Sequence, residues 1–151
     1  MKVHAIRYHD ISCGHTVYLH EGKCACLHGH NYRVTFYCET EQTDLLGGSV
    51  LDEVGRVVDF SVIKSTLCMW LEDNYDHRFL VYEKDPRAKA LLQVDSTIVI
   101  VPFNPTAENL ALYLLGRVGP KLLDGTGVIL TKVTVEETRK CSASAELADA
   151  S

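Results

Sequence analysis

Hydrophobic residues recur along the chain with two different periods, one typical of strands and one typical of helices. Around residue 35 the chain is dense in β-branched and aromatic residues, and Val34 and Phe36 alternate with Arg33 and Thr35, which predicts a strand. Similar apolar runs occur before and after it. The strands predicted in this way cover residues 3–8, 32–40, 96–101 and 128–138.

Two amphipathic helices are predicted between these strands. From Phe60 onward the apolar positions are three or four residues apart, and Asp59 is a suitable N-cap residue, so we predict a helix over residues 60–73. Thr106 is a second suitable N-cap, and the helix that it begins is expected to end before Gly119-Pro120. The element order is therefore ββαβαβ, which predicts an α+β fold.

The composition is that of an ordinary globular domain. The chain has 151 residues, of which 46% are hydrophobic and 23% charged, so we expect one domain spanning residues 1–151. A net charge of -5 argues against a nucleic-acid-binding surface. No apolar run reaches the roughly 18 residues of a membrane span, and residues 1–7 lack the core of a signal peptide. We therefore expect a cytoplasmic protein whose six cysteines are reduced.

Histidines are concentrated in the first 30 residues, which hold six of the seven. His28 and His30 are two residues apart next to a predicted strand, so they are expected to share one face and to offer two nitrogens to one metal ion. With His15 as a third ligand, one coordination position stays open, as in catalytic zinc sites. Two alternatives remain: an H-x-H pair is often a plain surface feature, and Cys24 and Cys26 with two histidines could form a closed structural zinc site.

Six short segments between residues 11 and 138 carry a distinctive combination of residues. They read Ile11-Ser12-Cys13-Gly14-His15, Cys24-Ala25-Cys26-Leu27-His28-Gly29-His30-Asn31-Tyr32, Gly55-Arg56-Val57-Val58-Asp59-Phe60, Asp76-His77-Arg78-Phe79-Leu80, Asn104-Pro105-Thr106-Ala107-Glu108-Asn109 and Glu137-Thr138. In residues and in order they resemble the motifs of the 6-pyruvoyl-tetrahydropterin synthase superfamily. The resemblance implies a tunnelling fold, in which an antiparallel four-stranded sheet carries two helices on one face. It also implies a homohexamer built from two trimers, with active sites between subunits.

The resemblance also implies roles for particular residues. It gives one zinc ion per subunit to His15, His28 and His30, with the ion acting as a Lewis acid on the substrate hydroxyls. It gives proton removal to Cys24, supported by Asp76 and His77. Cys26 competes for this role, but the family cysteine stands four residues before the first histidine of the H-G-H motif, as Cys24 does.

Substrate binding is implied for three further residues. The family uses a glutamate at the end of a strand to grip the aminopyrimidine ring, and the Glu-Thr match selects Glu137 over Glu136. Thr106 and Glu108 are expected to shape the pocket, although an N-cap and a first-turn acid also have structural reasons to occur there.

The family contains two branches that act on 7,8-dihydroneopterin triphosphate or a close relative. The 6-pyruvoyl-tetrahydropterin synthases eliminate triphosphate, whereas the 6-carboxy-tetrahydropterin synthases of the queuosine (7-deazapurine) route also break a side-chain carbon–carbon bond and release acetaldehyde. The spacing from Cys24 to His28 resembles the second branch, so we expect a zinc-dependent carbon–carbon lyase. The alternatives are the pyruvoyl reaction and a non-catalytic zinc- or pterin-binding paralogue. Residues 43–55 and 85–95 are longer than the family pattern.

Overall fold

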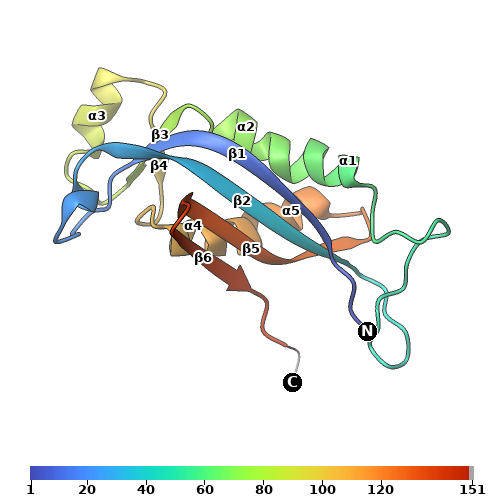
Figure 1. The fold of residues 1–151 in the computed structure, drawn as a ribbon. Coiled ribbons are helices and arrows are strands. Elements are labelled where there is room, and N and C mark those ends of the chain that lie inside the picture. Colours follow the sequence, from blue (N-terminus) through green and yellow to red (C-terminus); the bar gives the residue numbers. More distant parts are fainter. Residues whose placement is uncertain (150–151) are drawn as a thin grey trace.

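Six strands form one mixed sheet in the computed structural model, which describes residues 1–149 (Figure 1). The strands are β1 (Ala5–His15), β2 (His28–Thr40), β3 (Arg78–Tyr82), β4 (Val99–Val101), β5 (Val128–Thr138) and β6 (Cys141–Glu146). Their order across the sheet is β4-β3-β1-β2-β5-β6. Residues 150 and 151, the last two of the predicted domain, lie outside the described residues.

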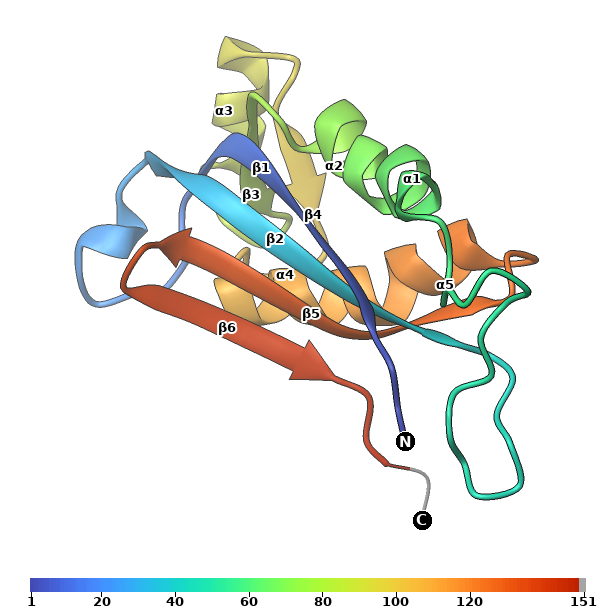
Figure 2. The ribbon, with the colours of Figure 1, turned by 45° about the vertical axis from the view of Figure 1, so that its right-hand side comes forward.

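The strands β1, β2, β5 and β6 pair antiparallel with one another, and the two short strands at one side of the sheet add parallel pairs. β1 pairs with β2, β2 with β5 and β5 with β6, all antiparallel, whereas β3 runs parallel to both β1 and β4 (Figure 2). The α+β class is therefore confirmed. Four of the strands, β1, β2, β5 and β6, pair antiparallel, but β3 and β4 extend the sheet to six strands and make it mixed, so a sheet of only four antiparallel strands is not confirmed.

Two of the six strands, β3 and β6, were not expected, and the physical reasons differ. β3 is a five-residue run, too short to show a period of its own. β6 consists mainly of cysteine, serine and alanine, which have little strand propensity, so its conformation depends on its pairing with β5. β1 is also longer than predicted. Its second half alternates buried and exposed positions, but the buried positions there include Cys13 and His15 and so lack an aliphatic pattern.

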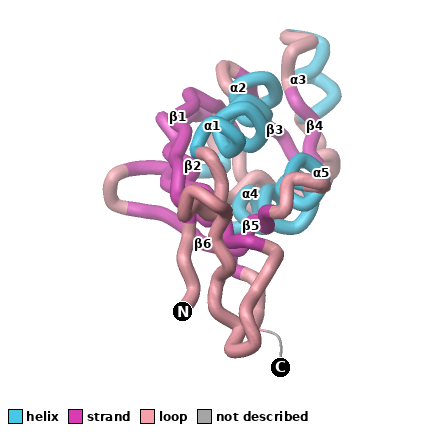
Figure 3. The backbone as a smooth tube through the Cα atoms, turned by 90° about the vertical axis from the view of Figure 1, so that its right-hand side faces the viewer, coloured by secondary structure: helices cyan, strands magenta, loops and turns pink. Residues whose placement is uncertain are grey.

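The helical segments cover one face of the sheet. They are η1 (a 3-10 helix, Lys23–Ala25), α1 (Phe60–Ile63), η2 (a π turn, Lys64–Cys68), α2 (Met69–Asn74), α3 (Ala88–Val94), α4 (Ala107–Tyr113), η3 (a π turn, Leu114–Val118) and α5 (Gly119–Leu123). Helices α1 and α2 contact β1, and α4 and α5 contact β5. Figure 3 shows these four helices on one side of β1 and β2. None of the helices in residues 1–149 combines the length and the apolar character needed to span a membrane.

The core lies between these helices and the sheet. Phe36, Val133 and Val135 on the strands belong to the same buried cluster as Ile63 and Leu114 on the helices. Along the strands the alternate residues face away from the helices and are largely exposed. The sheet therefore has one packed face and one open face.

The first helical segment matches the prediction, and the second is longer than predicted. The segment that begins at Phe60 runs without a break to Asn74, and the side chain of Asp59 caps it by accepting the backbone N–H of Ser61 at 2.8 Å. The second segment continues through Gly119-Pro120 to Leu123, so the predicted end is wrong. A π turn precedes the proline and puts it in the first turn of α5, where a missing N–H costs little.

Gly119 is required by close packing and not by a helix end. A Cβ atom added there would lie 2.5 Å from Cδ2 of Leu130 on β5 and 3.1 Å from the carbonyl oxygen of Leu114. At Gly116, one turn earlier in the same segment, a Cβ atom would meet no other atom within 4 Å. The two glycines thus form a matched pair for testing how tightly the helix packs on the sheet.

We expect Gly119→Ala to destabilise the protein by about 1–3 kcal/mol because the added methyl group overpacks the contact with β5. Gly116→Ala should instead stabilise it by about 0.5–1 kcal/mol because alanine loses less backbone entropy on folding. Urea unfolding of the two variants measures both effects. Equal shifts of the two midpoints would contradict this account of the packing.

Candidate functional site

Three histidines meet on the helix-covered side of the sheet, where β1 ends and β2 begins. In the antiparallel register His15 lies opposite His28, and Cys13 lies opposite His30. Paired residues share a face, and residues two apart in a strand share a face, so all three imidazoles point the same way. β2 begins at His28, earlier than predicted, and this extension is what gives the H-x-H pair its common direction.

The distances between the imidazoles suit one metal ion. Nε2 of His15 lies 2.9 Å from Nε2 of His28 and 3.2 Å from Nε2 of His30. A tetrahedral zinc ion with bonds of about 2.0–2.1 Å would hold its ligand nitrogens about 3.3–3.4 Å apart. Within residues 1–149, these three histidines are the group whose donor atoms lie close enough for a metal site, all within 4.8 Å of one another. That group contains no cysteine, so it does not match the alternative of a Cys-Cys-His-His site.

In the rings of His15 and His28, backbone carbonyl groups fix which nitrogen carries the hydrogen. Nδ1 of His15 lies 2.7 Å from the carbonyl oxygen of Pro105, and Nδ1 of His28 lies 2.7 Å from that of Cys26. A carbonyl oxygen only accepts hydrogen bonds, so both Nδ1 atoms carry the hydrogen and both Nε2 atoms present lone pairs. Two lone pairs facing each other at 2.9 Å repel unless a cation lies between them. The donor set therefore fits a metal ion.

Burial favours the neutral, metal-binding form of two of these rings, those of His15 and His30. His15 is only 1% exposed, and its burial lowers its pKa to about 4, although the contact with Pro105 opposes the shift. Burial also lowers the pKa of His30, against the opposing effect of the Glu137 carboxylate. At His15 a neutral imidazole is thus available well below neutral pH.

A pocket of about 310 Å³ lies near the histidine cluster, although none of the three histidines lines it. Its lining brings together four of the expected site residues from distant parts of the chain: Cys24 in η1, Thr106 and Glu108 at the start of α4, and Glu137 near the end of β5. An oxygen of the Glu137 carboxylate lies 3.8 Å from Nε2 of His30, so the pocket reaches the edge of the histidine cluster. His20 lines the same pocket and was not among the expected site residues.

The expected partners of Cys24 lie elsewhere. Asp76 and His77 line a different, wider hollow of about 900 Å³, which also reaches His30 and Glu137. The His77 side chain is 80% exposed, and its Nδ1 lies 2.7 Å from the Asp76 carboxylate. Within one chain the structure therefore places Asp76 and His77 together but does not bring them into the pocket of Cys24.

Asp76 is held in its ionised form by its contacts. Burial alone would raise the pKa of this carboxyl group, but hydrogen bonds from the backbone N–H of Ser12 and from His77 outweigh burial and lower it. His77 itself has a φ angle of 57°, in the left-handed region that non-glycine residues rarely adopt. Its backbone N–H donates to the carbonyl oxygen of Ser12 at 2.7 Å, which ties the Asp76-His77 pair to β1.

Comparison with known proteins identifies the family. The family model described as 6-pyruvoyl tetrahydropterin synthase matches residues 5–148. The chain belongs to this family. A protein of Rickettsia bellii named 6-carboxy-5,6,7,8-tetrahydropterin synthase is 31% identical over 134 residues, which cover 87% of this chain and 91% of that protein. A Halobacterium salinarum protein named probable 6-carboxy-5,6,7,8-tetrahydropterin synthase is 32% identical over 85% of this chain and 76% of its own length.

Solved structures of low sequence identity share the fold. An uncharacterized protein of Wolinella succinogenes aligns with a TM-score of 0.78 and 21% identity, covering 97% of this chain and 98% of its own. The 6-pyruvoyl tetrahydropterin synthase of Caenorhabditis elegans aligns with a TM-score of 0.68 and 22% identity, covering 98% of this chain and 97% of its own. The fold of the 6-pyruvoyl tetrahydropterin synthase family therefore extends over the whole described chain.

Several groups that build the site could not be found from the sequence. The carbonyl oxygens of Pro105 and Cys26 orient the histidines, but a backbone carbonyl has no sequence signal of its own. The hydroxyl of Tyr32 also lies 3.1 Å from Nδ1 of His15. The Asn104 side chain holds the backbone of Tyr18 through two hydrogen bonds of 2.7 and 2.9 Å. For Pro105 and Asn104, the Asn-Pro-Thr motif predicted only the start of a helix.

The lowered pKa of His15 predicts how the metal-free protein responds to acid. Unfolded His15 takes up a proton near pH 6.5, whereas the folded residue does so near pH 4. Between these pH values the unfolded chain binds more protons than the folded one. The contribution of His15 to the free energy of unfolding is therefore complete above about pH 6.5. It is lost as the pH drops toward 4, by at most about 3 kcal/mol.

The measurement is urea unfolding of chelator-treated protein at several pH values between 7 and 4. His15→Gln removes the titrating group, so its free energy of unfolding should change less steeply with pH than that of the wild type. Comparing slopes avoids any effect of the substitution on stability itself. Identical slopes for the two proteins would show that His15 does not carry this pH dependence.

Proposed function

We propose that the chain is a zinc-dependent lyase that converts 7,8-dihydroneopterin triphosphate to 6-carboxy-5,6,7,8-tetrahydropterin, with release of acetaldehyde and triphosphate, as in queuosine (7-deazapurine) biosynthesis. The observation that carries the proposal is the pocket that joins Cys24 and Glu137 beside three converging imidazoles. The names of the relatives at 31 and 32% identity support the carboxy product.

In this proposal His15, His28 and His30 hold one zinc ion per subunit. A zinc ion bound by three neutral nitrogens supplies a Lewis acid that makes a bound substrate hydroxyl more acidic. The protein keeps two of the three rings, those of His15 and His28, in place through the carbonyl groups of Pro105 and Cys26. Such outer contacts fix the ring orientation and raise the basicity of the ligand nitrogens.

Glu137 is proposed to bind the pterin ring. Its carboxylate can accept two parallel hydrogen bonds, from a ring N–H and from the exocyclic amino group, and such charge-assisted pairs fix the ring in register. Thr106 and Glu108 line the same pocket at the start of α4. The Thr106 oxygen already accepts the backbone N–H of Asn109 at 3.1 Å, which leaves its hydroxyl hydrogen to donate to the substrate.

Cys24 is proposed to take the proton from the substrate side chain, assisted by Asp76 and His77. His77 donates its Nδ1 hydrogen to the Asp76 carboxylate, which leaves Nε2 free to accept a proton. Asp76 and His77 lie outside the pocket of Cys24 in the same chain.

We therefore propose that a neighbouring subunit supplies the Asp76-His77 pair, in a homohexamer of two trimers with active sites between subunits. Two further features support the association. His77 is 80% exposed, and both edges of the sheet, at β4 and β6, have unpaired backbone groups that strands of another subunit can pair with. A catalytic thiol needs reducing surroundings, which favours the cytoplasm.

The deciding experiment is to incubate the zinc-loaded protein with 7,8-dihydroneopterin triphosphate and to identify the products by mass spectrometry. We expect 6-carboxy-tetrahydropterin and acetaldehyde. Cys24→Ala should lower turnover at least about 100-fold because a general base contributes about that much, while zinc content is unchanged.

Cys26→Ala is the matched control, because this nearby cysteine is exposed and contributes its backbone carbonyl, which alanine retains. It should turn over substrate like the wild type. A pyruvoyl product without acetaldehyde would move the chain to the other branch of the family. Unchanged substrate in the presence of bound zinc would contradict the proposed activity and favour a binding role.

A further inference from the structure

A buried ionic group next to the pocket has no part in the proposed reaction. Asp85 and Arg87 lie between β3 and α3. The Asp85 side chain is fully buried, and that of Arg87 is 43% exposed. A buried carboxylate is costly unless it is paired, so this arrangement needs a reason beyond surface solubility.

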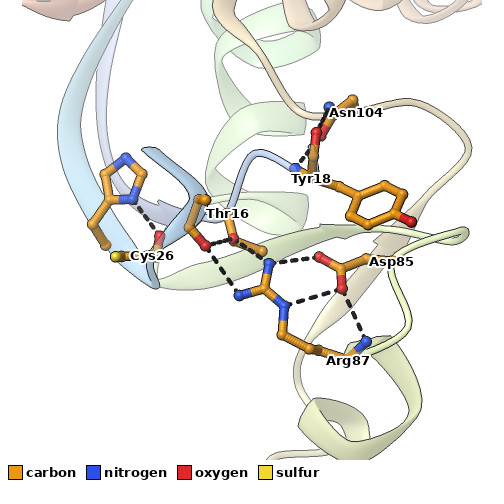
Figure 4. A network of polar contacts seen from close by, with 8 residues as sticks. Thr16, Tyr18, Cys26, Asp85, Arg87 and Asn104 are labelled. Carbon is orange, nitrogen blue, oxygen red and sulfur yellow. Dashed lines mark hydrogen bonds and ion pairs between the residues drawn. The ribbon is translucent and has the colours of Figure 1, made fainter. Parts of the chain in front are cut away.

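Asp85 fixes the plane of the Arg87 guanidinium group. Nε and one terminal nitrogen of Arg87 donate to the two carboxylate oxygens at 3.1 and 2.8 Å, and the backbone N–H of Arg87 donates to the same carboxylate at 2.9 Å (Figure 4). This two-point contact fixes the direction of the outer edge of the guanidinium group, which is the edge formed by its two terminal nitrogens.

The outer edge of Arg87 holds the loop that carries Cys24. One terminal nitrogen donates to the carbonyl oxygen of Ala25 at 3.0 Å, and the other donates to the hydroxyl oxygen of Thr16 at 2.7 Å (Figure 4). The Thr16 hydroxyl in turn donates to the same Ala25 carbonyl at 2.8 Å. Arg87, Thr16 and Ala25 therefore form a closed ring of hydrogen bonds across 62 residues of sequence.

This loop, residues 16–27, is held near its tip by hydrogen bonds: the backbone N–H of Val17 donates to the carbonyl oxygen of Cys24 at 2.8 Å, and Arg87 contacts the next residue, Ala25. The 3-10 helix η1, which contains Cys24, has no buried residue, so apolar packing does not fix it. The loop ends are fixed separately: Asn104 holds the backbone of Tyr18, and the carbonyl group of Cys26 contacts the ring of His28. Ala25 lies between these two points and directly follows Cys24.

We propose that Arg87, oriented by Asp85, is a positioning residue that sets where the Cys24 side chain lies in the pocket, through the carbonyl group of Ala25 and the hydroxyl group of Thr16. The inference rests on the proposed role of Cys24 as the base. A displacement of about 1 Å in a reacting group can cost about 100-fold in rate, so such a contact affects turnover without touching the substrate.

The test uses two substitutions that keep the buried carboxylate compensated. Arg87→Lys keeps a positive charge beside Asp85 but cannot contact Asp85, Thr16 and Ala25 together. Thr16→Val removes only the hydroxyl group and leaves the Asp85–Arg87 pair intact. Arg56→Lys is the control, since Arg56 is similarly exposed and also contacts carboxylates, those of Asp52 and Asp59, but not the Cys24 loop.

Three measurements are made on each zinc-loaded protein: kcat and KM for the pterin substrate, amide hydrogen exchange of residues 16–27, and the rate of Cys24 alkylation by iodoacetamide. Cys141, an exposed cysteine on β6 that lines the same pocket but lies outside the loop, is the internal reference for alkylation. Arg87→Lys and Thr16→Val should each lower kcat about 10- to 100-fold with KM within about threefold of wild type. They should also speed exchange in the loop and change Cys24 alkylation at least about threefold relative to Cys141. Arg56→Lys should change none of these.

The outcomes separate this inference from the proposed function. If the wild type makes the expected products but both variants keep its kcat, loop exchange and alkylation rate, the positioning role is wrong and the lyase proposal stands. A lower kcat with unchanged exchange and alkylation would also overturn the positioning role. If the wild type does not turn over the substrate, yet loop exchange and Cys24 alkylation change in both variants, the lyase proposal fails and the positioning of Cys24 by Arg87 stands.

Discussion

The structure depends on one electrostatic constraint, the convergence of imidazole lone pairs where β1 and β2 meet. The register of these strands places His15 opposite His28 and, two residues on, brings in His30. Carbonyl groups hold the Nδ1 hydrogens of His15 and His28, so these two rings direct lone pairs at the same point. Such a cluster is unfavourable without a cation, and burial keeps the protons away. A metal ion resolves this conflict, and the surroundings of the histidines are arranged accordingly.

The surrounding elements each secure one part of this cluster. The segment before α4 contributes the carbonyl group that orients His15, and through Asn104 it also fixes the start of the loop that carries Cys24. The other end of that loop orients His28. The segment after β3 holds the middle of the loop through Arg87. The histidine cluster, the thiol and the pocket are therefore coupled by hydrogen bonds between segments that are far apart in sequence.

The structure brings several of the predicted site residues together but differs from the predicted sheet, for a physical reason. Two ligand side chains at a fixed spacing, such as His28 and His30 on one strand, can be recognised in the sequence whatever strands pair around them. β6, by contrast, is a strand because β5 pairs with it, and its small side chains carry no pattern. The order of the motifs along the chain also says nothing about distances in space. The separation of Asp76 from Cys24 within one chain could therefore not be predicted. The backbone carbonyl groups that accept hydrogen bonds from the rings of His15 and His28 cannot be recognised from side chains in the sequence.

The most direct test of the central claim is X-ray absorption at the zinc edge of the zinc-loaded protein. The arrangement of His15, His28 and His30 predicts three nitrogen neighbours at about 2.0–2.1 Å and a fourth light atom from solvent, with no sulfur in the first coordination shell. Sulfur neighbours near about 2.3 Å would show that Cys24 or Cys26 binds the metal. That result would contradict a site with an open position, and a sulfur ligand from Cys24 would leave this thiol unable to act as the base.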